Sequence, residues 1–496
     1  MSGAGIQVRC LASTRIPTRD GQEKEREDGG DGEDSRGLER SDNDEANNQD
    51  LKEPGKREVE DDGASGSPSL SSLSSSTSSA SPDSLQHLRH TSCVQEAQLS
   101  PDGTCIFISD YDRTFSVYPI SHDLVSQPST QSLTPYASFH SANPIWAFAV
   151  NPLFNLQDAT TTTVVVSRRD SYITLHNALW DFSRDYTSTS PPTGPVNIST
   201  PLASYKLIDA LTEAVIAPHS LAYTHSGTHF FCGTRDKIVL FDMQETNQPI
   251  QTMRTIPARR NKLKGGGRGF KGCVSALSLS PPSASSRDGL LAAGSWTRHV
   301  GIYDALSGAE VTSFALPGSL KPQAQHLQHV VGDGVSSLRW SPCGNYLYVA
   351  ERRSDALLIY DVRSYSLALA HCIGRAALTK QKLGFDIWNA GASPYDIEAV
   401  SHEVWAGGTD GKIRVWRDPC WREGAVEPDE IVTVAGTDEP VVASLIHPTG
   451  SLAVAACGAV KMSELGEQKE QRGVQRGGET RPKIWEWGSV DILGLG

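Results

Sequence analysis

The stretch Val335–Asp361 reads VSSLRWSPCGNYLYVAERRSDALLIYD, and it contains the pattern that decides the fold. Three runs rich in Val, Leu, Ile and aromatic residues are separated by the polar segments SPCG and RRSD. Short runs of this composition, bounded by Gly, Pro, Ser and Asp, are typical of β-strands joined by tight turns. The stretch therefore predicts three consecutive strands.

The same pattern recurs seven times from about residue 90 onward. Seven copies of three strands, with a weaker fourth strand between copies, predict an all-β fold, a seven-bladed β-propeller over residues 85–496. We expect a strand near Leu85–Cys93 to pair with the last copy and close the ring. Two separate β domains fit less well, because no linker-like break follows residue 90. The copies are Val94–Tyr118, Trp146–His176, His219–Asp242, Val274–Asp304, Val335–Asp361, Phe385–Trp416, and Val441–Gly458 completed by Lys483–Trp487.

Residues 1–84 differ from the repeats in composition. A block of mixed charge, Glu23–Asp62, precedes a serine-rich run, and apolar residues are few. Such a segment buries too little apolar surface to offset the entropy of ordering, so we expect a disordered acidic and Ser-rich tail. The 496-residue chain has a net charge of −13, and neither a membrane-spanning apolar run nor a secretory signal is expected. Nine scattered cysteines without a CxxC pair indicate a reducing compartment.

The copies resemble WD40 repeats, with an aspartate before the third strand and an aromatic residue near its end. More narrowly, the chain is similar to the telomerase Cajal body protein family in the segments SPDGTCIFISDYDRTFSVY, PHSLAYTHSGTHFFCGTRDKIVLFD and LLAAGSWTRHVGIYD. It resembles a fungal member related to splicing-associated WD proteins. The resemblance implies a propeller that binds small nuclear or box H/ACA RNA, including telomerase RNA, together with its ribonucleoprotein proteins. It also implies nuclear localisation, in Cajal bodies and with some cytoplasmic protein. The chain is expected to be a monomer without a membrane partner.

The sequence contains no combination of residues that indicates an enzyme. The segment GGGRGFKG at 265–272 lacks the spacing and the Lys-Ser/Thr ending of a phosphate-binding loop. His219, His225 and His229 are close in sequence, but no carboxylate or thiolate joins them at metal-ligand spacing. We therefore expect no catalytic residue, metal or cofactor. The aspartates before the third strands are interpreted as structural, each accepting backbone N–H bonds in its turn: Asp112, Asp170, Asp236, Asp355 and Asp410.

Basic residues recur where the second strand of a copy turns into the third. In such a propeller these turns share one face with the connections between copies, so we expect a basic face on an acidic protein. Local charge governs attraction of phosphate because salt screens distant charges. Phe270 in the Gly-rich connection is predicted to stack on an unpaired base. The candidate RNA-binding residues are Arg235, Arg259, Arg260, Lys262, Lys264, Arg268, Phe270, Lys271, Arg298, Arg352, Arg353, Lys380 and Lys382.

Two functional interpretations remain open from the residues. The first is a non-enzymatic RNA-binding propeller that escorts or localises small nuclear ribonucleoproteins. The second is a protein-interaction scaffold, for example a spliceosomal assembly factor, in which the arginines pair with neighbouring turn aspartates and no RNA is contacted.

Overall fold

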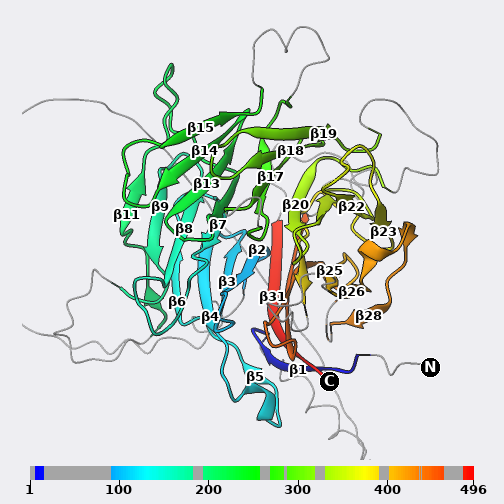
Figure 1. The fold of residues 1–496 in the computed structure, drawn as a ribbon. Coiled ribbons are helices and arrows are strands. Elements are labelled where there is room, and N and C mark those ends of the chain that lie inside the picture. The colour runs from blue at the N-terminus through cyan, green and yellow to red at the C-terminus, as the bar shows by residue number, and fades with distance from the viewer. Residues whose placement is uncertain are drawn as a thin grey trace, which may run out of the picture. The chain divides into compact units, whose positions relative to one another are not determined.

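The computed structural model describes residues 6–15, 91–181, 194–256, 269–283, 288–318, 330–389, 401–434, 436, 438–462 and 484–496. Their strands form seven antiparallel blades of four strands each, arranged in a ring (Figure 1). The predicted all-β propeller is therefore confirmed, including the weaker fourth strand. From the innermost strand outward, blade 1 contains β2 (Val94–Leu99), β3 (Cys105–Asp110), β4 (Thr114–Pro119) and β6 (Ala137–His140). Blade 2 contains β7 (Ile145–Val150), β8 (Thr163–Arg168), β9 (Ile173–Asn177) and β11 (Ala203–Tyr205).

The remaining blades follow in chain order. Blade 3 contains β12 (Ser220–Tyr223), β13 (His229–Thr234), β14 (Lys237–Asp242) and β15 (Gln251–Arg254). Blade 4 contains β16 (Val274–Leu279), β17 (Leu290–Ser295), β18 (His299–Asp304) and β19 (Glu310–Ala315). Blade 5 contains β20 (Val335–Trp340), β21 (Tyr346–Glu351), β22 (Leu357–Asp361) and β23 (Ala370–Cys372). Blade 6 contains β24 (Phe385–Trp388), β25 (Glu403–Gly407), β26 (Lys412–Arg417) and β28 (Glu430–Thr433). Blade 7 contains β29 (Val441–Ile446), β30 (Leu452–Met462), β31 (Ile484–Leu495) and β1 (Val8–Ser13).

The core is divided among the interfaces between neighbouring blades. The second strand of each blade is buried on both faces, so its successive side chains enter different interfaces. In β21, Leu347 and Val349 pack against blade 4, whereas Tyr348 and Ala350 pack against blade 6. Full burial of a Leu or Val side chain contributes roughly 1.5–3 kcal/mol. This arrangement explains why the second strands are continuous apolar runs instead of alternating ones.

The ring is closed by the N-terminal strand β1. It pairs antiparallel with β31, from Val8 opposite Leu495 to Ser13 opposite Asp491, so that both ends of the chain share blade 7 (Figure 1). Arg15 forms an ion pair of 2.8 Å with Asp491, which also accepts a hydrogen bond of 2.5 Å from Ser13 Oγ. Burial raises the pKa of the Asp491 carboxyl. The edge of blade 7 is therefore covered by a segment from the opposite end of the chain.

This closure corrects two expectations. The closing strand is Val8–Ser13 and not the segment near Leu85–Cys93, and residues 6–15 belong with the propeller instead of the predicted tail. The strand has only six residues, VRCLAS. The average composition of residues 1–84 therefore gives no sign of it. Leu11 and Ala12 are buried in the core between blades 7 and 1. Residues 16–90 lie outside the described residues.

Three blades gain a short parallel strand from the next blade. In each case the connection between the third and fourth strands of one blade reaches back to the outer edge of the blade before it. Covering an edge satisfies backbone groups that would otherwise be open to pairing with another chain. The added strands are β5 (Gln131–Ser132) on β1, β10 (Val196–Asn197) on β6, and β27 (Gly424–Val426) on β23.

Helical structure in the described chain is limited to short 3-10 turns. These turns are η3 (Leu124–Ser126) and η5 (Pro419–Trp421). Nowhere in these ranges is there a helix with the length and apolar character needed to span a bilayer.

Candidate nucleic-acid interface

The turns between second and third strands meet the connections between blades at one end of the central channel. A hollow of about 690 Å³ at this end is lined both by residues of such turns, including Tyr111, Trp296 and Arg352, and by Gln381 and Lys382 of the connection from blade 5 to blade 6. We call this hollow the channel mouth. The predicted shared face of these segments is therefore present, and its centre is concave.

Three aromatic rings from successive blades line one half of the mouth. Trp146 belongs to β7, His219 directly precedes β12, and Trp296 follows β17. The rings of Trp146 and His219 are stacked, with centroids 4.1 Å apart and an interplanar angle of 14°. Trp296 continues the series at 5.0 Å from His219 and is 44% exposed. We call these three residues the aromatic ladder, and Trp296 is its most open member.

The other half of the mouth is cationic. Arg352 follows β21, and Lys380 and Lys382 lie in the connection from β23 to β24. Arg352 Nη1 donates to the Lys380 carbonyl over 3.3 Å, whereas the buried Arg352 Nε has no hydrogen-bond partner within the described residues. The guanidinium group remains charged in proteins. One wall of the mouth therefore carries positive charge.

The charge of Arg352 reaches the aromatic ladder. Burial, and secondarily repulsion by Arg352, lower the pKa of the His219 imidazole. The neutral form of His219 is therefore favoured, and its ring stacks on Trp146 and contacts Trp296 at an interplanar angle of 57°. The aromatic and cationic halves are close enough to act on one ligand.

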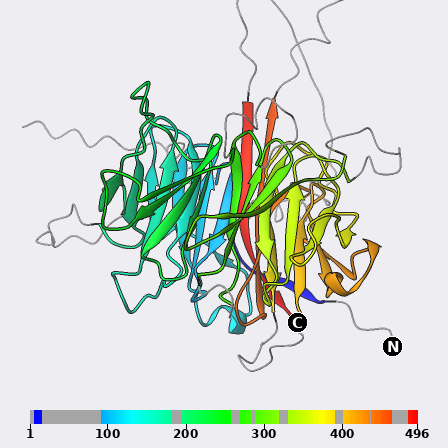
Figure 2. The same ribbon diagram turned by 45° about the horizontal axis from the view of Figure 1, so that its top comes forward.

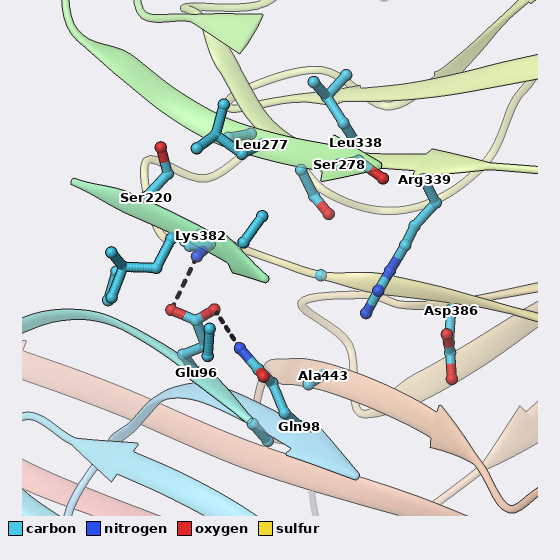
Figure 3. Close-up of a pocket in the computed structure, with 18 of the residues that line it drawn as sticks. Glu96, Gln98, Ser220, Leu277, Ser278, Leu338, Arg339, Lys382, Asp386 and Ala443 are labelled. Atoms are coloured by element: carbon cyan, nitrogen blue, oxygen red, sulfur yellow. Dashed lines mark hydrogen bonds and ion pairs between the residues drawn. The ribbon is translucent and has the colours of Figure 1, made fainter. Parts of the chain in front are cut away.

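An ion pair crosses the floor of the mouth. Lys382 Nζ lies 3.0 Å from Glu96 Oε2, and Gln98 Nε2 donates to Glu96 Oε1 over 3.4 Å (Figure 3). Below this pair, a second hollow of about 430 Å³ occupies the channel between the inner strands, where Arg339 and Asp386 lie (Figure 3). The pair separates the two hollows, so a ligand in the mouth rests on a polar floor.

Blade 7 extends beyond this end of the ring. β30 and β31 remain paired as far as Met462 opposite Ile484, and Figure 2 shows both strands projecting past their neighbours. Val460 of this extension lines the mouth, and Gln381 Nε2 donates to the Gly458 carbonyl over 2.9 Å. The extension therefore forms a raised wall on one side of the mouth.

Two of the predicted RNA-binding residues have structural roles instead. Phe270 is only 3% exposed and packs in the core between blades 3 and 4, so its ring is not open to a base. Arg298 forms an ion pair with Glu351, with Nε–Oε2 and Nη2–Oε1 distances of 2.5 and 2.9 Å, and also donates to the Pro317 carbonyl. Because the Arg298 guanidinium is bonded to other residues of the protein, we exclude Arg298 from the candidate interface.

The other predicted RNA-binding residues within the described ranges lie either at the mouth or elsewhere on the same face. Arg352, Lys380 and Lys382 meet at the mouth, while Arg235 and Lys271 are exposed on the same face. Arg353 is exposed and forms an ion pair of 3.1 Å with Asp333. The remaining candidates lie outside the described residues: Arg259, Arg260, Lys262, Lys264 and Arg268.

Two of the predicted turn aspartates bind the connections between blades. Asp236 accepts a hydrogen bond of 2.7 Å from the Gly272 N–H, and Asp355 accepts one of 3.2 Å from the Ala377 N–H. Both bonds fix a connection beside the turn, although we expected them within the turn itself. These carboxylates therefore help to shape the face on which the mouth opens.

The other three aspartates differ from the expectation. In blade 1 the carboxylate of Asp110, and not that of Asp112, accepts the Thr114 N–H bond, at 2.8 Å. Asp170 forms an exposed ion pair of 3.2 Å with Arg169. Asp410 forms two hydrogen bonds, of 2.7 and 2.8 Å, with Arg414. The aspartate ring is thus structural in several ways, and within the described residues no three His, Cys, Asp or Glu side chains gather closely enough to hold a metal ion.

The aromatic ladder was missed by sequence reasoning. His219 was considered only as a metal ligand, and Trp146 and Trp296 only as parts of strand patterns. Both Trp146 and His219 stand at the start of an inner strand, and Trp296 directly follows a second strand, at the position of Arg235 and Arg352 in two other copies. Comparison of these equivalent positions around the ring could have placed the three rings at the same end of the channel.

Comparison with known proteins confirms the resemblance seen in the motifs. No protein-family model matches the chain. The chain is 22% identical over 373 residues to telomerase Cajal body protein 1 of Rattus norvegicus, and 23% identical over 382 residues to that of Homo sapiens. These matches cover 75% and 76% of this chain and 59% of either relative, so the chain spans about three fifths of their length. It is also 24% identical over 328 residues to guanine nucleotide-binding protein negative regulator 1 of Schizosaccharomyces pombe, covering 64% of this chain and 69% of that protein.

Proposed function

We propose that this chain is a non-enzymatic RNA-binding propeller that escorts or localises small nuclear or Cajal-body RNAs, including telomerase RNA, in the nucleus. The observation that carries the proposal is the channel mouth, where the aromatic ladder faces Arg352, Lys380 and Lys382. Aromatic rings bind unpaired bases by stacking, and basic side chains bind phosphates. The names of the mammalian relatives support the nuclear and telomerase-related part of the proposal.

The negative net charge of the chain is compatible with RNA binding. The net charge of −13 is distributed over 496 residues, whereas a phosphate at the mouth experiences mainly the charges within a Debye length of about 8–10 Å. Three cations and one carboxylate line the mouth, and that carboxylate, Glu96, is paired with Lys382. The local balance therefore favours an anionic ligand.

Salt-dependent filter binding tests the proposal. Purified full-length protein is titrated with a small nuclear RNA at several salt concentrations, and the double variant Arg352→Gln/Lys380→Gln is compared with the native chain. We expect the variant to lose about tenfold in affinity and to flatten the log–log salt slope by roughly 1.4 units, since each phosphate contact to a single strand contributes about 0.7.

The matched control removes two exposed cations from the opposite end of the propeller. Arg363 and Arg422 lie in connections between third and fourth strands, and Arg363→Gln/Arg422→Gln changes the net charge by the same amount. Equal loss in the two double variants would indicate non-specific attraction. No binding of RNA by the native chain would overturn the proposal.

The second candidate is a protein-interaction scaffold without RNA contact. It is favoured by the name of the fission-yeast relative, which describes a regulator of another protein. In that case the mouth would hold a peptide, and the RNA titration would show no binding by native protein.

A further inference from the structure

We infer that the channel mouth holds one unpaired nucleotide of a single-stranded RNA segment, with its base on Trp296 and its phosphate at Arg352, and that it excludes double-stranded RNA. This inference rests on the proposed function and specifies which form of RNA the site takes and how it is oriented. It follows from the size of the mouth, the aromatic and cationic residues that line it, the fixed backbone of the ladder and the floor beneath it.

The size of the mouth suits a single nucleotide. A hollow of about 690 Å³ lies within the range of about 300–1,000 Å³ that is usual for sites of small ligands. A paired and stacked base cannot present its face to a protein ring, whereas an unpaired base in a loop or single strand can. The dimensions and the chemistry of the mouth therefore both select an extruded base.

The two halves of the mouth match the two ends of a nucleotide. Trp296 offers an exposed ring face, and the face of Trp146 is already covered by His219. In the turn of the next blade, the Arg352 side chain lines the mouth, and Lys380 is exposed beside it. A base stacked on Trp296 would direct its phosphate toward these donors.

The backbone that carries two of the ladder residues is held in place by hydrogen bonds. The backbone N–H of Trp296 donates to the Cys273 carbonyl over 3.1 Å, and the backbone N–H of His219 donates to the Gly233 carbonyl over 2.9 Å. Gly334, with a φ of +113°, packs against the Trp296 backbone so closely that a Cβ there would lie 2.6 Å from the Trp296 carbonyl oxygen. A stacking platform whose backbone is already fixed loses little backbone entropy on binding.

The floor limits how far a ligand enters. The Lys382–Glu96 ion pair lies between the mouth and the lower channel, and residues of both hollows include these two side chains. Threading of an RNA strand through the ring would require this pair to open. One nucleotide resting on the floor requires no such change.

Fluorescence anisotropy with the full-length chain tests the inference. The probes are a labelled single-stranded oligoribonucleotide, the same strand annealed to its complement, and adenosine monophosphate as a competitor. We expect the single strand to bind at least about tenfold more tightly than the duplex. Adenosine monophosphate should compete only at far higher concentration, because it makes few of the backbone contacts of an RNA strand. A competitor as strong as the RNA strand would overturn the assignment to RNA.

Three tryptophan variants locate the stacking site. Trp296→Ala should weaken single-strand binding roughly 5- to 150-fold with an unchanged salt slope, since stacking on one ring contributes about 1–3 kcal/mol. Trp180 is the matched control, because it is 45% exposed and follows β9 at the opposite end of the propeller. Trp180→Ala should bind as the native chain does, and Trp296→Phe should recover part of the loss. A thermal melt of each variant confirms that it is folded.

The outcomes separate this inference from the proposed function. If RNA binds but the duplex binds as tightly as the single strand, or if Trp296→Ala matches Trp180→Ala, the single-nucleotide inference is overturned while RNA binding stands. If neither form of RNA binds the native chain, both are overturned.

Discussion

The turns after the second strands of blades 4 and 5 contain similar residues with different roles. Both present an arginine, Arg298 in SWTRH and Arg352 in ERRSD. Arg298 is tied to Glu351, and the two side chains are 12% and 1% exposed. Arg352 follows Glu351 directly in the chain, yet it lines the mouth and uses only part of its donor capacity. Two adjacent residues of blade 5 therefore have different roles. Glu351 forms an ion pair with Arg298 of blade 4, and Arg352 lines the mouth.

The same contrast separates two aromatic residues near the junction of blades 3 and 4. Phe270 was the sequence-based choice for stacking on a base, but it packs in the core. Trp296, at the turn position that Arg352 occupies in blade 5, is open at the mouth. Proximity in sequence to basic residues is therefore a weak guide to which ring a ligand reaches.

The largest expected effect concerns this aromatic pair. Phe270→Ala should lower the free energy of unfolding by about 3–5 kcal/mol, because it leaves a cavity in the core. The RNA affinity of the folded fraction should remain unchanged. Chemical denaturation followed by fluorescence measures the first quantity. A variant with native stability but weaker RNA binding would reverse the roles assigned to Phe270 and Trp296.

The next effect tests the arginine of blade 4. Arg298→Gln leaves the Glu351 carboxylate buried without its charged partner, and loss of one member of a buried pair costs about 3–5 kcal/mol. Thermal melting and denaturant titration measure the loss. Arg353→Gln is the control, since its pair with Asp333 is exposed and should contribute no more than about 1 kcal/mol. An equal loss of stability in the two variants would contradict the structural role of Arg298.

A smaller effect tests the arginine of blade 5. Arg352→Gln should leave the melting temperature close to native and weaken RNA binding about fivefold, with a salt slope flatter by roughly 0.7 units. Filter binding at several salt concentrations provides the measurement. If Arg352→Gln instead unfolds the protein as Arg298→Gln does, the distinction between the two turns disappears.

The last effect concerns the corresponding turn of blade 1, which follows a buried carboxyl, that of Asp110, at the end of β3. Burial raises the pKa of Asp110 from 3.8 to about 7. Between these pH values the folded protein holds a proton that the unfolded chain has lost, so the contribution of Asp110 to stability falls as pH rises through this window. Asp110→Asn should remove this decline while keeping an acceptor for the Thr114 N–H. Melting temperatures of both proteins across this pH range measure the difference, and parallel curves would contradict the raised pKa.

The sequence was sufficient for features that repeat locally. Strand runs such as VSALSL and HVGIYD, with Gly and Pro between them, predicted the blades because each strand is defined by its own residues and turns. The shared face of the turns followed from strand order alone. Arg352, Lys380 and Lys382 were found in this way.

Features that depend on contacts between distant segments were not predictable from one sequence. The partner of Arg298 is 53 residues away, on the next blade, and β1 pairs with a strand at the other end of the chain. The aromatic ladder joins residues of three blades, so no local pattern contains it. Each of these features depends on how the blades pack, which local strand patterns do not encode.

Crosslinking of a bound RNA to the full-length chain, followed by mass spectrometry of the crosslinked peptides, tests most directly whether the mouth is the RNA-binding site. The account predicts crosslinks in peptides that contain Trp296, Arg352 and Lys380, and their loss when the RNA is fully base-paired. Crosslinks confined to peptides of the opposite end, such as those with Trp180 and Arg363, would contradict it.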